Sequence, residues 1–109
     1  MTVEKVSDVF ATHLPERLKS KPNLAENVNA TYKFDINGDG GGVWCLDLTK
    51  AGGEIRPGDG EAQCILTIKA ADFIDMINGR LNPQAAFMTG KLRIAGDVGL
   101  ALKLGSILG

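Results

Sequence analysis

A strand-like alternation in the first half of the chain is the strongest constraint on its fold. Apolar side chains occupy every second position from Val28 to Ile36, and polar side chains lie between them. This period of two indicates a strand with one face in a core. Residues 37–42, Asn-Gly-Asp-Gly-Gly-Gly, suit a tight turn, and residues 43–48 alternate again. The pattern predicts a β-hairpin with Trp44 on the same face as Leu46 and Leu48.

Helices and further strands are predicted on both sides of this hairpin. Apolar residues recur at helical spacing before Leu14, and Pro15 is expected to kink or end that helix, with a short second piece following it. The order of elements predicts a single α+β domain over residues 1–109, with a sheet covered by helices. Further strands are expected near residues 54–56, 62–68 and 91–95, and further helices near residues 70–78, 82–88 and 97–108.

The last predicted helix has an unusual composition. Lys103 is the one charged residue between Val98 and Leu108. A surface helix normally keeps a polar face, so a helix that is apolar nearly all round needs apolar contact on more than one side. The helix near residues 70–78 is similarly apolar. Together these segments indicate an apolar cavity, although ordinary core packing is the better explanation for any single residue among them.

Composition and motifs exclude several classes of function. The net charge of −1 with scattered Lys and Arg argues against nucleic-acid binding. No window is long and apolar enough to span a bilayer, and the first residues do not resemble a signal peptide. Cys45 and Cys64 are expected to be buried, reduced thiols. His13 is the only histidine, and no nucleophile or acid–base pair accompanies it, so neither an enzyme nor a cofactor is expected.

One segment resembles the start of a calcium-binding loop. Residues 35–40 read Asp-Ile-Asn-Gly-Asp-Gly, but Leu46 occupies the position where a bidentate glutamate is required. The preceding residues alternate as a strand does, whereas such a loop follows a helix. A hairpin turn is therefore favoured over a metal site, and no metal is expected.

A long C-terminal segment resembles the sterol carrier protein 2 family. Residues 81–104 read Leu-Asn-Pro-Gln-Ala-Ala-Phe-Met-Thr-Gly-Lys-Leu-Arg-Ile-Ala-Gly-Asp-Val-Gly-Leu-Ala-Leu-Lys-Leu and carry that family's signature. The hairpin with Trp44 and the run Ala71-Asp72-Phe73 are also similar. The resemblance implies a five-stranded, mostly antiparallel sheet covered on one face by helices, with a hydrophobic tunnel between them. Peroxisomal members end in a Ser-Lys-Leu-type address, whereas residues 106–109 read Ser-Ile-Leu-Gly, so a stand-alone cytoplasmic protein is expected.

The resemblance further implies non-catalytic binding or transfer of a fatty acid, fatty acyl-CoA, phospholipid or sterol-like ligand. A monomer with at most transient membrane contact is expected, and a dimer stays open. The alternative is an interaction or dimerisation module that docks on a lipid-metabolising enzyme through the apolar C-terminal helix. The residues expected to line the tunnel are Trp44, Phe73, Ile74, Met76, Ile77, Leu81, Phe87, Met88, Leu100, Leu104, Ile107 and Leu108.

Overall fold

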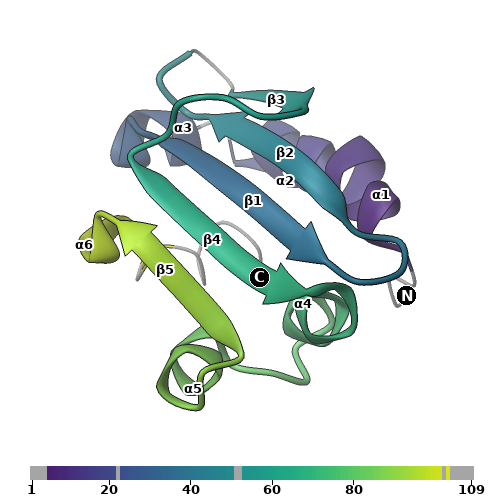
Figure 1. Cartoon of the computed structure of the whole chain (residues 1–109). Coiled ribbons are helices and arrows are strands. Elements are labelled where there is room, and N and C mark those ends of the chain that lie inside the picture. Colours follow the sequence, from purple (N-terminus) through teal and green to yellow (C-terminus); the bar gives the residue numbers. More distant parts are fainter. Residues whose placement is uncertain (1–4, 22, 51–52, 102, 104–109) are drawn as a thin grey trace.

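Five strands form an open, mixed sheet in the order β3-β2-β1-β4-β5 (Figure 1). The computed structural model describes residues 5–21, 23–50, 53–101 and 103, and leaves out the side chains of residues 24–26. Strand β1 is parallel to β4, and the other neighbouring strands are antiparallel. The predicted α+β class and the predicted hairpin are therefore confirmed. The strands are β1 (Thr31–Asn37), β2 (Gly42–Asp47), β3 (Glu54–Pro57), β4 (Cys64–Lys69) and β5 (Leu92–Gly96).

Strand β1 lies in the middle of the sheet and carries the alternation seen in the sequence. Tyr32, Phe34 and Ile36 point to one face and are almost fully buried. In the register of the sheet, Phe34 lies between Trp44 of β2 and Leu66 of β4. Because apolar side chains align across neighbouring strands, this face, the inner face, is a continuous apolar surface.

The N-terminal helices cover the inner face, behind the sheet in Figure 1. Phe10 is the central contact. Its ring stacks on Trp44 at 4.4 Å and on Phe73 at 5.7 Å between centroids, and it meets Phe34 edge-on at 5.4 Å. Phe73 belongs to α4 (Ala70–Ile77), so this one ring joins the N-terminal helices, the sheet and α4. The N-terminal segments are α1 (Val6–Asp8), the π-helical turn η1 (Val9–His13), α2 (Leu14–Ser20) and α3 (Asn23–Val28).

Pro15 interrupts the first helix as predicted, whereas one predicted boundary nearby was wrong. A π-helical turn, in which the Leu14 N–H donates to the Val9 carbonyl, precedes the short second helix α2 at Pro15. The wider π-helical turn accommodates the ring of Pro15, which in an α-helix would clash with the carbonyl one turn earlier. The strand predicted from Val28 begins only at Thr31, since Val28 ends α3 and Asn29 adopts a positive φ of 47°. Asparagine tolerates this left-handed conformation and commonly ends helices.

Helices α4 and α5 (Pro83–Met88) begin and end close to the predicted residues, whereas the end predicted near residue 108 for the last helix lies outside the described residues. Gly79, with a φ of 77°, follows α4 as expected for a helix C-terminus. Asn82 caps α5, and its side chain accepts hydrogen bonds from the backbone N–H groups of Gln84 and Ala85. The last described helix is α6 (Val98–Ala101). None of the helices in the described part of the chain is long and apolar enough to cross a membrane.

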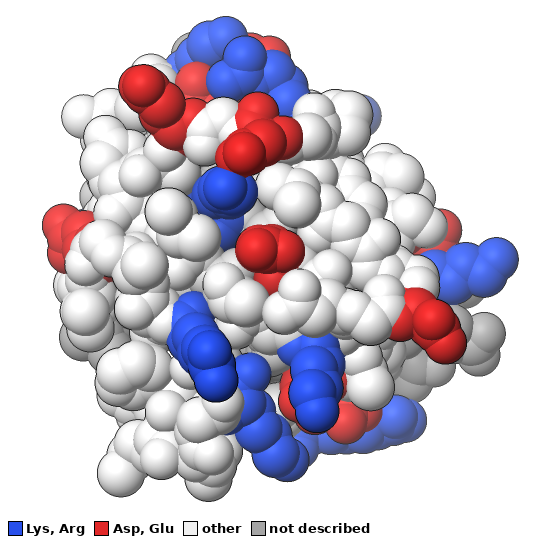
Figure 2. Space-filling model, viewed as in Figure 1, with Lys and Arg blue, Asp and Glu red and all other residues white. Residues whose placement is uncertain are grey.

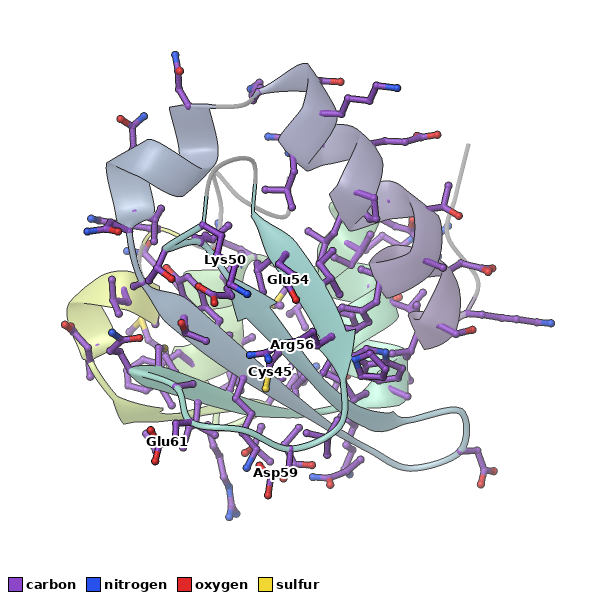
Figure 3. All side chains as sticks on the ribbon, turned by 90° about the horizontal axis from the view of Figure 1, so that it is seen from above. Cys45, Lys50, Glu54, Arg56, Asp59 and Glu61 are labelled. Carbon is purple, nitrogen blue, oxygen red and sulfur yellow. The ribbon has the colours of Figure 1, made fainter. Side chains whose placement is uncertain are left out.

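The opposite face of the sheet, the outer face, is crossed by the connection from β3 to β4. Figure 3 shows Asp59 and Glu61 of this connection on the side away from the N-terminal helices. The Asp59 carboxylate pairs with the Lys33 ammonium at 2.5 Å, and the Cys45 thiol donates to the Gly58 carbonyl at 3.5 Å. The connection therefore buries Cys45 on a face that is otherwise partly polar.

We expect Phe10→Ala to lower the free energy of unfolding by about 3 kcal/mol, the usual cost of removing a fully packed aromatic ring. Urea denaturation followed by circular dichroism measures this value. Ser7→Ala is the control, because Ser7 is exposed on the same helical run. A loss below about 1 kcal/mol would show that the helices do not depend on this ring.

Candidate functional site

An apolar cleft of about 400 Å³ lies between α5, β5 and α6. This volume is within the range of about 300–1,000 Å³ typical of small-molecule sites. Phe87 and Met88 in its wall are 45% and 84% exposed, which is unusual for large apolar side chains. Its lining consists of Asn82, Pro83, Gln84, Phe87, Met88, Leu92, Ile94, Val98 and Ala101.

Strand β5 forms the floor of the cleft through the alternation of its side chains. Leu92 pairs with Ile68 and Ile94 with Leu66, so both belong to the inner face of the sheet. Leu92 is buried and Ile94 is half-buried. Because β5 is the edge strand of the sheet, its inner side chains have a neighbouring strand on one side only, and they line the cleft. The site therefore lies at one end of the core.

Helix α6 is held beside the cleft by two hydrogen bonds from distant parts of the chain. The buried Tyr32 hydroxyl donates to the Leu100 carbonyl at 2.5 Å, and the Asp97 N–H donates to the Gln63 carbonyl at 2.9 Å. Gly96 makes the turn with a φ of 89°, and a Cβ there would lie 2.2 Å from the Gln63 carbonyl oxygen. Glycine is thus required where β5 leads into α6.

Comparison with known families decides the membership of this chain. The SCP-2 sterol transfer family matches residues 11–109. The chain belongs to this family. Its SCP-2 fold is similar to the apo form of sterol carrier protein 2 from Yarrowia lipolytica, with a TM-score of 0.76 and 26% identity over 98% of this chain and 93% of that one. It is also similar to Aedes aegypti sterol carrier protein 2 in complex with palmitate, a C16 fatty acid, with a TM-score of 0.77 and 25% identity over 99% and 97% of the two chains.

Longer proteins also contain a segment similar to this SCP-2 chain. Hydroxysteroid dehydrogenase-like protein 2 of Bos taurus is 38% identical over 88 residues, which cover 79% of this chain and 21% of that protein. The protein of the same name from Xenopus tropicalis is 44% identical over 80 residues, which cover 72% of this chain and 19% of that protein. The chain thus spans about a fifth of the length of these curated relatives.

The residues predicted to line the hydrophobic tunnel lie in different parts of the SCP-2 chain. Phe87 and Met88 line the cleft, and Leu100 is half-buried beside it on α6. Phe73, Met76 and Ile77 of α4 lie in the core, whereas Trp44, Ile74 and Leu81 are half-buried against it. These residues do not line the cleft formed by the described residues. Leu104, Ile107 and Leu108 lie outside the described residues. The full tunnel lining stays a prediction.

Several cleft residues were not singled out from the sequence. The alternation in residues 91–95 predicts Leu92 and Ile94 on one face of a strand, but the sequence does not show that this strand lies at the sheet edge. Val98 and Ala101 come from α6, whose position depends on the Tyr32 hydrogen bond. The alternation of apolar residues in β5 is the sequence signal that could have pointed to Leu92 and Ile94. It shows which side chains share a face of the strand, but it does not show what covers that face.

Cys64 and Tyr32 are the titratable groups most affected by the core next to α6. Burial raises the pKa of the Cys64 thiol from 9.0 to about 11, and the negative charge of Asp97 adds to the effect. Burial also raises the pKa of the Tyr32 hydroxyl, with smaller contributions from Cys64 and Asp97. Both groups are therefore protonated at neutral pH. Within the described ranges, no three His, Cys, Asp or Glu side chains gather so that they could hold a metal ion.

We expect Tyr32→Phe to release α6, because it removes the donor to the Leu100 carbonyl while keeping the ring. The free energy of unfolding should fall by about 1 kcal/mol, the usual net value of one hydrogen bond. Hydrogen exchange of the amides at residues 98–101 should become faster, while exchange in α5 stays unchanged. Unchanged exchange at residues 98–101 would mean that this hydrogen bond does not hold α6.

We expect stability to decrease as the pH rises from about 9 to about 11. The unfolded Cys64 thiol loses its proton near pH 9, whereas the folded thiol keeps it until about pH 11, so higher pH favours the unfolded state. The raised pKa of Tyr32 acts in the same direction. Urea denaturation across this range measures the slope, and Cys64→Ala should reduce it. An equal slope in both proteins would contradict the assignment to Cys64.

Proposed function

We propose that this chain reversibly binds the apolar chain of a fatty acid or fatty acyl-CoA in the cleft between α5, β5 and α6, without catalysing a reaction. The observation that carries the proposal is the apolar cleft itself, with large side chains such as Met88 left exposed in its wall. The palmitate complex of the similar Aedes aegypti protein supports this class of ligand. Membership of the SCP-2 sterol transfer family supports a role in lipid binding.

Removal of apolar surface from water is the driving force for binding. Each Å² of buried apolar surface contributes about 25 cal/mol, so a long acyl chain gains several kcal/mol before its losses of entropy. Leu92 and Ile94 offer a preformed apolar floor, and Phe87 and Met88 offer adaptable side chains. The exposed amide of Gln84 lies at the rim, where a polar headgroup stays in contact with water.

The chemistry of the cleft lining supports a carrier rather than an enzyme. The lining contains aliphatic, aromatic, thioether and amide side chains, and none of them titrates near neutral pH. Acid–base catalysis needs a group that exchanges a proton, and covalent catalysis needs an activated nucleophile. The described cleft offers neither type of group, so binding and release are the chemistry that it supports.

An interaction module is the second candidate function. The curated relatives are about five times longer than the matching segment, which favours a domain that works beside an enzyme domain. In that case the apolar surface near α6 would dock on a lipid-metabolising enzyme or on a second copy. Analytical ultracentrifugation separates the two functions, because a tight dimer that excludes fatty acid supports docking and a monomer that binds fatty acid supports the carrier.

We expect Val98→Glu to lower the affinity for a fluorescent long-chain fatty acid by about tenfold, because the new carboxylate must be desolvated by an acyl chain in the cleft. Val98 is 48% exposed and is the first residue of α6, where a negative charge is tolerated, so folding should be preserved. Fluorescence titration measures the affinity.

Ala95→Glu is the matched control for this titration. Ala95 is exposed, lies three residues away, and pairs with Ile65 on the outer face of the sheet. The Ala95→Glu variant should bind the fatty acid with the same affinity as the unchanged protein. Saturable binding that both variants keep at full affinity would show that the cleft is not the site. Absence of saturable binding by the unchanged protein, and of lipid in its native mass spectrum, would reject the proposed function.

A further inference from the structure

Strand β5 is a free edge of the sheet. Figure 1 shows it as the outermost strand, with α5 at one end and α6 at the other, and no strand of the described residues pairs with its free edge. Such edges are usually protected by a proline, a bulge or a charge that points inward. Residues 92–96 contain no proline, their register with β4 is continuous, and their one charged side chain, Arg93, points to the outer face. The described edge can therefore accept another strand.

The backbone of β5 determines which groups face this free edge. The Asp97 N–H donates to the Gln63 carbonyl of the segment that leads into β4, and the N–H groups of an extended strand alternate in direction. Counting back from Asp97, every second N–H group therefore points to β4. The N–H groups between them point to the free edge, and they belong to Leu92, Ile94 and Gly96.

A second copy of β5 matches these outward groups. With a two-fold axis at Ile94, each Ile94 exchanges two hydrogen bonds with the partner's Ile94, and each Gly96 N–H donates to the partner's Leu92 carbonyl. A shift of two residues in either direction leaves one outward N–H group of each copy without a strand residue opposite it. The register centred on Ile94 is therefore the one that uses the whole edge.

The same register brings opposite charges together. Lys91 lies opposite the partner's Asp97, and both side chains are exposed and form no ion pair within the described residues. Figure 2 shows an acidic surface at the α6 end of this edge and a basic surface toward its α5 end. Because two paired copies run in opposite directions, the acidic end of one meets the basic end of the other. The charge pattern thus favours a second copy as the partner.

The two helices beside β5 carry apolar side chains that this pairing would cover. Phe87 and Met88 of α5 are 45% and 84% exposed, and Val98 of α6 is 48% exposed. These three are the exposed large apolar side chains of the described residues. Since the paired strands are antiparallel, the end of α5 comes beside the partner's α6. An exposed apolar patch of this kind marks an interaction surface.

We propose that two copies of this chain pair through their β5 edges, so that two five-stranded sheets become one continuous sheet. Helix α5 of each copy then packs beside the partner's α6 and covers the open side of each apolar cleft. The pairing goes beyond the proposed function, because it concerns the assembly of the protein. It also differs from docking that excludes fatty acid, since hydrogen bonds of β5 hold the copies together and both clefts are kept.

Sedimentation equilibrium of the full chain at concentrations up to about 1 mM, where weak interfaces form, tests the pairing. The unchanged protein should form a reversible dimer. Ala95→Lys should weaken the dimer about fivefold, because Ala95 lies opposite the partner's Arg93 and two pairs of like charges then form across the axis. Ala95→Glu is the matched control at the same exposed position, and it should strengthen the dimer about fivefold.

A second variant and a second measurement test the register. Lys91→Glu should weaken the dimer about tenfold, because two attractive pairs with the partner's Asp97 become repulsive. Lys91 is exposed, so the fold should stay intact. Hydrogen exchange of the Ile94 amide should slow as the protein concentration rises, whereas exchange of the Ala95 amide, which points to β4, should change less.

The outcomes separate this pairing from the proposed function. In dilute solution, where the chain is a monomer, Ala95→Lys and the unchanged protein should bind the fluorescent fatty acid equally well, because Ala95 does not line the cleft. A protein that binds this fatty acid but stays monomeric up to about 1 mM overturns the pairing alone. A dimer that neither Ala95→Lys nor Lys91→Glu weakens also overturns it, since the copies then meet at another surface. A dimer that both variants weaken, without fatty acid binding, supports the pairing and rejects the proposed function.

Discussion

Burial of the inner side of β1 is the constraint on which the rest of this structure depends. Phe34 packs against Phe10 and Phe73, so the same side chain organises the N-terminal helices and α4. Two positions earlier, the Tyr32 hydroxyl reaches the Leu100 carbonyl and holds α6. A shift of one residue in this strand would turn both rings to the outer face. The packing of the core and the position of the cleft therefore both depend on the register of β1.

The candidate site lies where the apolar core reaches the edge of the sheet. The middle strands are covered by helices, and their inner side chains are almost completely buried. At β5 the described residues of α5 and α6 border a cleft. The inner face thus continues from a packed core into an accessible apolar surface. In the proposed function, an acyl chain would complete the core at this edge.

Local signals in the sequence were reliable where a few neighbouring residues specify the backbone. The helix predicted near residues 82–88 starts with Asn82 and Pro83, and the helix predicted near residues 70–78 is followed by Gly79. The wrong boundary arose where neighbouring residues favour different backbone conformations. Val28 continues the alternation of the strand, but it is also the last residue of α3, and the helix prevailed. Pro15 interrupts a helix as predicted, but the sequence did not show that the interruption takes the form of a π-helical turn.

The type and order of most elements followed from periodicity, caps and turns, because these depend on contacts within a few residues of the chain. Tertiary structure decided which apolar side chains became core and which became cleft. Phe73 and Phe87 both lie on short apolar helices, yet Phe73 is completely buried and Phe87 is 45% exposed. The difference arises because α4 packs beneath Phe10 and Phe34, whereas α5 packs beside the edge strand. Burial depends on which elements meet, and no local pattern contains that information.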